Sequence, residues 1–372
     1  MEISTSQKIL NELLISYKIS RTELEKKLNI TPSTLSYTIK KIKDLIEIYK
    51  EPSLGQGRPK QYLSLNKDYW ISLGVKVGRD YVNITKLNGR FEILERYTFK
   101  LSKKNIGNEN LSKFLNDAFE KISEKENIKA VGMAFSGEVV EQKINSKILK
   151  LENFSPEKIV KTHFKNSVHS ILNDVEAIAT EEYIKYKGED ILVINYGTGI
   201  GACYYGNGEL KNNKNRKIIE IGHFFAGGHE KCYCGSTGCL ETLASDYAVL
   251  KKFKFNNLKI VDFIENEENF ENDLKEVRTL YKTFKKRAEE IYEDTFNYLT
   301  IFISTIFRIL EPKKVILTGE GVTPWFSQML QKKIINSNKI PIPIIFRGLE
   351  NNIELGASIN ALQKYIMTKI EW

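Results

Sequence analysis

Apolar residues near the start of the chain recur three and four residues apart, which is the spacing of one face of an α-helix. The first such group comprises Ile9, Leu10, Leu13 and Leu14. A second, shorter helix contains Leu24 and Leu28 and ends near Asn29. A third is expected from Thr31, a good N-cap, with Pro32 at the first helical position. The pattern therefore predicts three short helices in succession.

The third predicted helix has one apolar and one polar face. Its apolar stripe consists of Leu35, Ile39, Ile42 and Ile46. The side chains that this stripe leaves pointing away from the core are Ser33, Thr34, Ser36, Tyr37 and Lys40. Such side chains can reach base edges in a DNA groove while neighbouring lysines approach phosphates. The helix is therefore predicted to recognise DNA, with a plain helical bundle as the alternative.

The segment that follows favours the DNA-binding interpretation. Residues 55–60 are rich in glycine and precede alternating apolar positions, as in a β-wing. Arg58 would lie at the tip of that wing, where an arginine can enter a minor groove. An exposed linker turn is the alternative for this segment. We predict a winged helix-turn-helix DNA-binding domain over residues 1–66.

From Trp70 onward, predicted strands alternate with helices. The expected strands are 71–77, 82–87, 130–135, 191–195 and 315–319, and the expected helices are 111–122 and the apolar 298–310. This alternation predicts an α/β fold, in two lobes with a cleft that suits a ligand. No GxGxxG motif leads into a helix, so a dinucleotide-binding fold is set aside.

Composition and charge narrow the class of protein. The chain has 372 residues, 41% of them hydrophobic and 28% charged, which is typical of a globular protein with several domains. Its longest apolar run, residues 298–307, is too short to span a membrane, and no signal peptide is evident, so we expect a cytoplasmic protein. Residues 1–66 hold eleven Lys or Arg against seven Asp or Glu, a local excess of +4 within a net charge of +9. That excess is compatible with a polyanionic partner.

Three of the four cysteines, Cys232, Cys234 and Cys239, lie within eight residues of one another. In a reducing compartment such a cluster indicates metal ligands before disulfides. With His223 they supply one imidazole and three thiolates, a set that suits a structural, tetrahedral Zn²⁺. Spacing alone leaves two alternatives open: His229 in place of His223, and thiols without metal.

The stretch from Glu220 to Glu241, with its GH…CxCGxxGCxE pattern, closely resembles the signature of the ROK family of bacterial repressors, open-reading-frame products and sugar kinases. The resemblance covers nearly the whole chain, and its N-terminal domain resembles the repressor branch, which includes xylose and N-acetylglucosamine repressors. It implies a two-lobed actin/hexokinase-like (ribonuclease H-like) fold over residues 67–372. Its small lobe would comprise residues 67–184 with the C-terminal helix 356–372, and its large lobe residues 185–355.

The resemblance also implies a sugar pocket. Its residues would be Asn153, Asn173, Asp174, Glu220, His223 and Glu241, with His223 also bound to zinc. Carboxylates and amides suit this task because they hydrogen-bond vicinal hydroxyls and reject isomers that leave them unpaired. Taken singly, each of these residues would more often be a cap or a solvated side chain.

In the kinase branch of the family, the aspartate at the position of Asp174 acts as general base, and an Asp-x-Gly-Gly-Thr turn binds the ATP phosphates. In residues 73–80 of this chain Lys76 replaces the acidic residue, and Arg79-Asp80 replaces Gly-Thr. Glu320 adds a negative charge near the second set of nucleotide-side glycines. We therefore expect no kinase activity and no catalytic residue.

These features together predict a sugar-responsive repressor of carbohydrate-utilisation genes. It would bind a monosaccharide effector in the cleft and a double-stranded DNA operator as a homodimer or a dimer of dimers, without a membrane partner. The alternatives are a sugar kinase with an accessory DNA-binding domain and a repressor with a vestigial pocket. The sequence leaves the sugar open, with xylose and glucose as expectations from the family alone.

Overall fold

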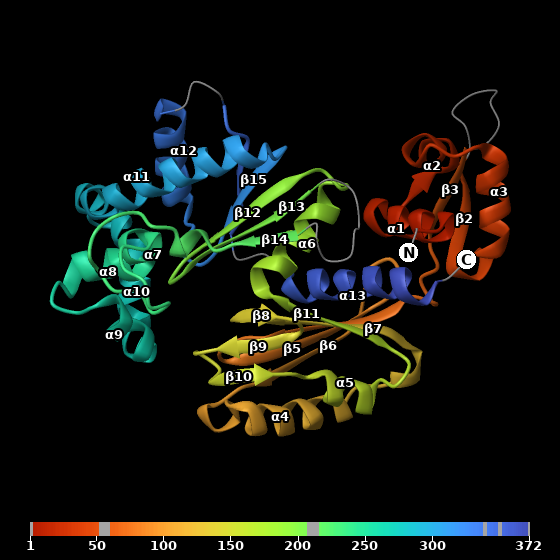
Figure 1. Ribbon diagram of the computed structural model, residues 1–372, viewed down its shortest axis with the longest axis horizontal. Coiled ribbons are helices and arrows are strands. Elements are labelled where there is room, and N and C mark those ends of the chain that lie inside the picture. The colour runs from red at the N-terminus through yellow and green to blue at the C-terminus, as the bar shows by residue number, and fades with distance from the viewer. Residues whose placement is uncertain (1–2, 52–59, 207–215, 338–340, 349–351, 371–372) are drawn as a thin grey trace. The chain divides into compact units, whose positions relative to one another are not determined.

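The computed structural model describes residues 3–51, 60–206, 216–337, 341–348 and 352–370 (Figure 1). It divides into two compact units. The first unit comprises Met1–Gly188 and Asn352–Trp372, and the second comprises Glu189–Asn351. Within the described residues, no helix is both long and apolar enough to cross a membrane.

The first unit begins with three helices and a small antiparallel sheet of order β1-β3-β2, which we call the N-terminal module (residues 3–65). Its helices are α1 (Thr5–Ser16), α2 (Arg21–Leu28) and α3 (Pro32–Lys41), and its strands are β1 (Ile19–Ser20), β2 (Ile46–Glu51) and β3 (Lys60–Leu65). Side chains cap all three helices: Ser4, Ser20 and Thr31 accept hydrogen bonds from first-turn amides. These N-caps fix the residue at which each helix begins.

The third helix is shorter than its apolar stripe predicts. α3 ends at Lys41, a 3₁₀ turn spans Lys43–Leu45, and Ile46 starts strand β2. Ile42 and Ile46 are both buried, so their spacing correctly indicates the core. The extension of the helix to Ile46 is nevertheless wrong, because β2 pairs with β3 from Ile46 onward.

The rest of the first unit is built on a five-stranded sheet of order β11-β7-β4-β5-β6. Its strands are β4 (Ile71–Val77), β5 (Tyr81–Leu87), β6 (Ile93–Lys100), β7 (Ile128–Phe135) and β11 (Val168–Asn173). A three-stranded sheet adds β8 (Glu138–Val140), β9 (Lys143–Ser146) and β10 (Leu151–Phe154). The helices are α4 (Asn108–Glu120), α5 (Glu157–His163), α6 (Asp174–Lys185) and α13 (Ile353–Lys369), with 3₁₀ turns at Lys103–Asn105 and Lys125–Asn127.

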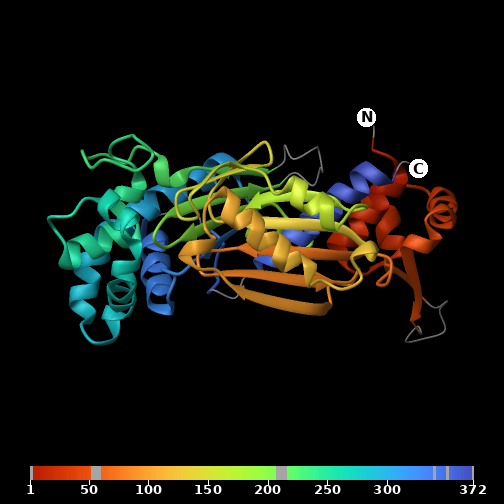
Figure 2. The same ribbon diagram turned by 90° about the horizontal axis from the view of Figure 1, so that it is seen from below.

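Helices cover both faces of the larger sheet, with α13 on one side and α4 on the other (Figure 1), and Figure 2 shows the same layers from below. Two glycines let α13 approach the strands closely. A Cβ at Gly74 or at Gly132 would lie 1.8 Å from the carbonyl oxygen of Glu354 or Ala357 respectively. Any side chain at these positions would force α13 away from the sheet.

The N-terminal module packs directly on this part of the first unit. The Gln7 side chain on α1 donates a 3.0 Å hydrogen bond to the carbonyl oxygen of Met367 on α13. The indole of Trp70 donates a 2.7 Å hydrogen bond to the carbonyl oxygen of Leu45. These contacts tie the module to the C-terminal helix and to the first strand of the larger sheet.

The second unit is also built on a five-stranded sheet, of order β14-β13-β12-β15-β16. Its strands are β12 (Ile191–Tyr196), β13 (Ile200–Tyr205), β14 (Arg216–Ile219), β15 (Lys314–Thr318) and β16 (Ile344–Phe346). Its helices are α7 (Leu240–Ala244), α8 (Asp246–Lys254), α9 (Ile260–Glu265), α10 (Glu271–Thr279), α11 (Lys285–Leu310) and α12 (Pro324–Ser337), with 3₁₀ turns at Ile221–His223, Glu267–Phe270 and Leu280–Lys282.

The two large sheets share one topology. The central strand is β4 in the first unit and β12 in the second. On one side of it, two further strands follow, each antiparallel to the strand before it. On the other side, two strands follow that are each parallel to the strand before them. The apolar helix expected over 298–310 is the second half of α11. Its Ile303 and Ile306 are buried, but Ile301 and Ile309 are exposed, so only one face of it packs on the core.

Candidate functional site

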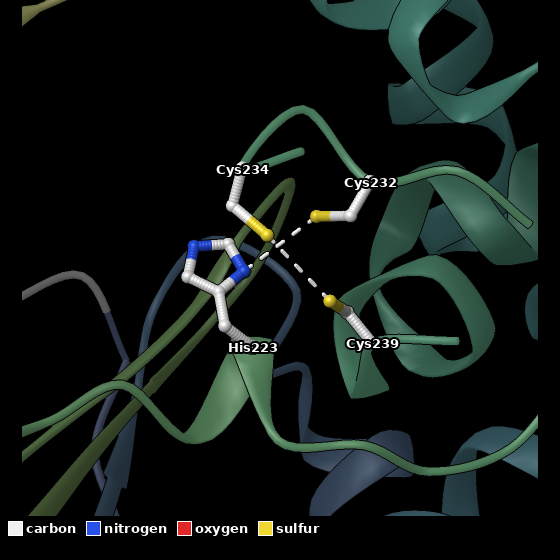
Figure 3. A group of neighbouring side chains, drawn as sticks. All are labelled: His223, Cys232, Cys234 and Cys239. Carbon is white, nitrogen blue, oxygen red and sulfur yellow. Dashed lines mark hydrogen bonds between the residues drawn. The ribbon is translucent and has the colours of Figure 1, made fainter. Parts of the chain in front are cut away.

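One histidine and three cysteines of the second unit converge on a single point (Figure 3). Their ligand atoms, on His223, Cys232, Cys234 and Cys239, all lie within 4.8 Å of one another. Two isolated β-bridges, Phe225 with Cys239 and Lys231 with Thr237, fold the loop back on itself. The loop closes through left-handed backbone at Gly238, where φ is +69° and a Cβ would meet the Gly227 carbonyl oxygen at 2.6 Å.

The spacing of these ligand atoms fits a tetrahedral zinc ion. Zinc–sulfur bonds of about 2.3 Å and zinc–nitrogen bonds of about 2.0–2.1 Å, at tetrahedral angles, separate two sulfurs by about 3.8 Å and sulfur from nitrogen by about 3.6 Å. The Cys234 and Cys239 sulfurs are 3.7 Å apart, and the Cys232 sulfur is 3.6 Å from Nδ1 of His223. His229, the alternative ligand, is exposed and lies outside the cluster of described residues. The donor set therefore fits a closed, four-coordinate structural site.

Glu241 lies two residues after the last cysteine, in α7, and its side chain is buried at 3% exposure. Its Oε2 accepts a 3.1 Å hydrogen bond from the backbone amide of Ile200, and its carboxylate also accepts a hydrogen bond from the Tyr233 hydroxyl. Burial raises the pKa of Glu241, against the opposing effects of the Ile200 amide and the nearby His223. This carboxylate is thus held in a fixed place beside the metal loop.

The other two sugar-binding candidates of the second unit flank the same loop. Glu220 is exposed and immediately precedes the 3₁₀ turn that carries the half-buried His223. Both residues act electrostatically on Glu241, so the three form one cluster. The Tyr233 and His223 rings form a T-shaped pair with a centroid distance of 5.2 Å and an interplanar angle of 76°.

In the first unit, strand register brings a second polar group together. Val77, Phe135 and Asn173 are aligned at the carboxyl ends of the parallel strands β4, β7 and β11. Asp174 follows at the start of α6, and its Oδ2 accepts a 3.1 Å hydrogen bond from the Ser136 hydroxyl. Burial raises the pKa of Asp174, while that hydrogen bond and the charge of Lys76 act in the opposite direction.

The two asparagines predicted for this unit have different environments. Asn173 caps α6 by accepting a 2.8 Å hydrogen bond from the Val175 amide, and it donates a 2.6 Å hydrogen bond to the Gly137 carbonyl oxygen. Asn153 lies on β10 with an exposed side chain and a left-handed backbone, φ +47°. Its amide donates a 2.9 Å hydrogen bond to the Asn145 side chain. The structure therefore groups Asn173 with Asp174 and places Asn153 on the neighbouring small sheet.

Two residues of these clusters were missed from the sequence. Ser136 directly follows the predicted strand 130–135. Parallel alignment of that strand with the strand before Asp174 would have placed Ser136 beside this carboxylate. Tyr233 stands between two cysteines, and no local pattern indicates that its hydroxyl reaches a carboxylate eight residues later.

The turn that was compared with a phosphate-binding loop joins β4 and β5. The Gly78 amide donates a 3.0 Å hydrogen bond to the Tyr81 carbonyl oxygen, which closes the turn. Arg79 is half-buried and Asp80 is exposed. Glu320, the other departure from the kinase pattern, forms a 3.0 Å ion pair with Arg278. Arg278 also pairs with the buried Asp246 at 2.7 Å, so one positive charge is shared between two carboxylates.

On the N-terminal module, most of the predicted DNA-contacting side chains share one solvent-facing side of α3. Ser33, Thr34, Tyr37 and Lys40 are exposed, with Tyr37 at 62%. Ser36 is half-buried instead, because its hydroxyl accepts a 2.7 Å hydrogen bond from the Arg21 guanidinium. Arg58 lies outside the described residues.

Comparison with known proteins places this geometry in a family. A model of the ROK family matches residues 72–340. The chain belongs to the ROK family. One relative is the xylose repressor of Caldicellulosiruptor bescii, which is 30% identical over 66% of this chain and 65% of the repressor. Another is the DNA-binding transcriptional dual regulator NagC of Escherichia coli, which is 21% identical over 91% of this chain and 87% of NagC. The alignment with the xylose repressor thus spans a little under two thirds of that relative.

Solved structures show the same mixed α/β fold. A ROK family transcriptional regulator described as a homolog of the E. coli MLC protein has a TM-score of 0.73 and 17% identity, and the alignment covers 97% of both chains. Sugar kinases are also relatives, for example a glucokinase of Halalkalibacterium halodurans, 27% identical over 49% of this chain and 57% of the kinase. The family therefore contains both repressors and kinases, and the residues of the site are needed to distinguish the two functions.

Proposed function

We propose that this ROK protein is a sugar-responsive, DNA-binding transcriptional repressor of carbohydrate-utilisation genes that does not phosphorylate its sugar. The observation that carries the proposal is the polar, basic outer face of α3. This helix belongs to the N-terminal module, which precedes the region matched by the ROK model and packs against α13. The names of its relatives, a xylose repressor and a transcriptional regulator, support the same assignment.

The N-terminal module is proposed to act as a winged helix-turn-helix. Three short helices followed by an antiparallel pair are the elements of that motif, and α3 takes the position of the recognition helix. Thr34 and Tyr37 are placed to contact base edges, and Lys40 to contact a phosphate. A pseudo-palindromic operator would be read by two such modules, so we infer a homodimer or a dimer of dimers.

The effector is proposed to be a monosaccharide, whose hydroxyl groups would donate hydrogen bonds to carboxylates and accept them from side-chain amides. The residues proposed to bind it are Asn153, Asn173 and Asp174 in the first unit and Glu220, His223 and Glu241 in the second. Two carboxylates, Asp174 and Glu241, are each fixed by donors of the protein, which leaves their remaining acceptor positions oriented for hydroxyl groups.

Zinc is proposed to be a structural ion held by His223, Cys232, Cys234 and Cys239. When bound, it would supply rigidity and no Lewis-acid chemistry, because a four-ligand site offers no open position for a substrate. His223 faces the cluster with Nδ1, so its Nε2 is not required as a metal ligand and can donate to a sugar hydroxyl. The loop between the cysteines then keeps Glu220 and Glu241 in place.

Absence of kinase activity is proposed from the turn between β4 and β5. Lys76 supplies a positive charge next to Asp174 where a kinase would hold an acidic residue, and the side chains of Arg79 and Asp80 occupy positions that a phosphate cradle leaves bare. Glu320 adds to this argument, because its partner Arg278 also pairs with Asp246 and the three side chains keep a net negative charge.

Binding of the sugar is proposed to change the affinity for DNA through the first unit. Asp174 begins α6, which packs on α13, and α13 carries the carbonyl oxygen of Met367 that Gln7 contacts. A sugar can release DNA only as far as it prefers the conformation that binds DNA poorly. Typical couplings of about 1–3 kcal/mol correspond to roughly 5- to 150-fold weaker DNA binding.

The test is thermal unfolding of the full chain against a panel of monosaccharides, with and without ATP-Mg²⁺, followed by fluorescence anisotropy with candidate operator DNA. We expect one sugar to raise the midpoint, ATP to leave it unchanged, and the sugar to alter DNA affinity. A midpoint shift with ATP, followed by ATP consumption in the presence of that sugar, would instead establish a kinase.

A further inference from the structure

Tyr233 is the residue between the two metal-ligating positions Cys232 and Cys234, and its side chain contacts His223 and Glu241. Its hydroxyl donates to the buried carboxylate of Glu241. Its ring and the His223 ring form a T-shaped pair with centroids 5.2 Å apart. One side chain thus contacts two of the groups proposed to bind sugar.

The hydrogen bond to Glu241 matters because of how that carboxylate is held. Glu241 is only 3% exposed, and a buried carboxylate needs donors to stay in one orientation. The Ile200 amide supplies one donor, to Oε2, and the Tyr233 hydroxyl supplies another. Gly222 lies so close that a Cβ there would be 2.6 Å from Oε2, so the carboxylate has little room to move on that side.

The backbone of Tyr233 is fixed by its neighbours rather than by a helix or a strand. The Cys232 amide donates a 2.8 Å hydrogen bond to the Ser236 carbonyl oxygen, and the Gly235 amide donates a 3.0 Å hydrogen bond to the Cys232 carbonyl oxygen. The other constraint available to this turn is the metal, which would bind the residue on each side of Tyr233. The position of the hydroxyl is therefore tied to the metal loop.

We propose that Tyr233 is a positioning residue for sugar recognition, which orients Glu241 through its hydroxyl and so makes sugar affinity depend on the metal loop. The inference rests on the proposed function, because it presupposes that Glu241 binds the effector. Tyr233 itself is not a metal ligand, and its role is carried by a single oxygen atom. Tyr233→Phe removes that atom and keeps the ring that contacts His223.

The experiment compares zinc-loaded, full-length wild type with Tyr233→Phe, Glu241→Gln and the double variant by isothermal titration calorimetry. The probes are D-xylose, D-glucose and N-acetyl-D-glucosamine, and zinc content is measured for each protein. We expect Tyr233→Phe to weaken binding of the preferred probe on the order of 10-fold, the effect of one hydrogen bond to a charged group. Zinc content should remain that of the wild type.

A double-mutant cycle separates positioning from general packing. In the Glu241→Gln background, Tyr233→Phe should weaken binding much less than it does in the wild type, because the group that it orients is already altered. Tyr298→Phe is the matched control: this half-buried tyrosine packs on the core of the same unit, and its loss of a hydroxyl should leave sugar affinity unchanged.

Three results would overturn the inference by itself, and a fourth would overturn the proposed function on which it rests. Wild-type affinity in Tyr233→Phe would show that the hydroxyl does not matter, and loss of zinc in that variant would show a purely structural role. Equal effects of Tyr233→Phe in the presence and absence of the Glu241 carboxylate would exclude action through Glu241. If the wild type binds none of these probes and no monosaccharide of the thermal-unfolding panel, the proposed function is wrong, and the inference fails with it.

Discussion

Replacement of Asp174 by asparagine should separate sugar binding from folding. The carboxylate begins α6, where Oδ2 accepts from Ser136 and Oδ1 lies 2.9 Å from the Val175 amide. Asparagine keeps an Oδ1 acceptor for one of these donors and leaves Asn173 as the helix cap. The variant should therefore fold, with an altered charge and one altered acceptor as its only large changes.

The expected loss of sugar affinity follows from the type of hydrogen bond that is lost. A hydrogen bond to a charged group contributes about 1.5–3 kcal/mol, which corresponds to roughly 10- to 150-fold weaker binding. Stability should change much less than sugar affinity, or rise, because burial of the Asp174 charge is unfavourable in the free protein. The charge of Lys76 partly compensates that cost.

The pH dependence supplies an independent check. Because burial raises the pKa of Asp174 in the folded protein, the folded state holds this proton more tightly than the unfolded state does. The contribution to stability is therefore greatest at low pH and is lost as pH rises from the ordinary aspartate pKa through the raised one. Sugar affinity should change in the opposite direction, falling as the carboxylate is protonated on acidification.

The assay is calorimetric titration with the preferred monosaccharide between pH 4 and 8, alongside thermal unfolding of the free proteins. In Asp174→Asn the affinity should be low and its pH profile flatter than that of the wild type. Ser136→Ala is the matched control, since it removes a donor to Asp174 while keeping the carboxylate, and should cost less affinity. An unchanged affinity in Asp174→Asn would refute the assignment of this residue to the sugar site.

Three further predictions concern the metal loop, the recognition helix and the contact between the N-terminal module and α13. Cys234→Ser should lose zinc, measured by metal analysis, and weaken sugar binding while leaving DNA affinity within about twofold in the absence of sugar. Lys40→Ala should weaken DNA binding and reduce the slope of log K against log salt by about 0.9, whereas Lys113→Ala, at an exposed site on α4, should leave that slope unchanged. Gln7→Ala removes the bond to Met367 and should destabilise the packing of α1 by about 1 kcal/mol, seen as faster amide exchange in α1. A wild-type exchange rate there would count against a coupling path through α13.

Much of the local structure of this protein is determined by its sequence. The helix start at Thr31 follows from a capping side chain that acts within three residues, and buried apolar positions follow from spacing. The metal-loop motif and the family likewise depend on residue types within a short stretch, so sequence alone predicts them. Short-range interactions of this kind require no knowledge of the fold.

Tertiary structure decided what depends on distant segments meeting. It selects His223 over His229 for the metal cluster, because the 3₁₀ turn brings the first to the cysteines and leaves the second exposed. Pairing with β3 ended α3 before Ile46, and alignment of parallel strands brought Ser136 to Asp174. The same applies to the partner of Glu320, because Arg278 reaches this turn from α10, about forty residues earlier in the chain. Each of these outcomes depends on packing between elements that are distant in the sequence, and the spacing of residues along the chain does not predict such packing.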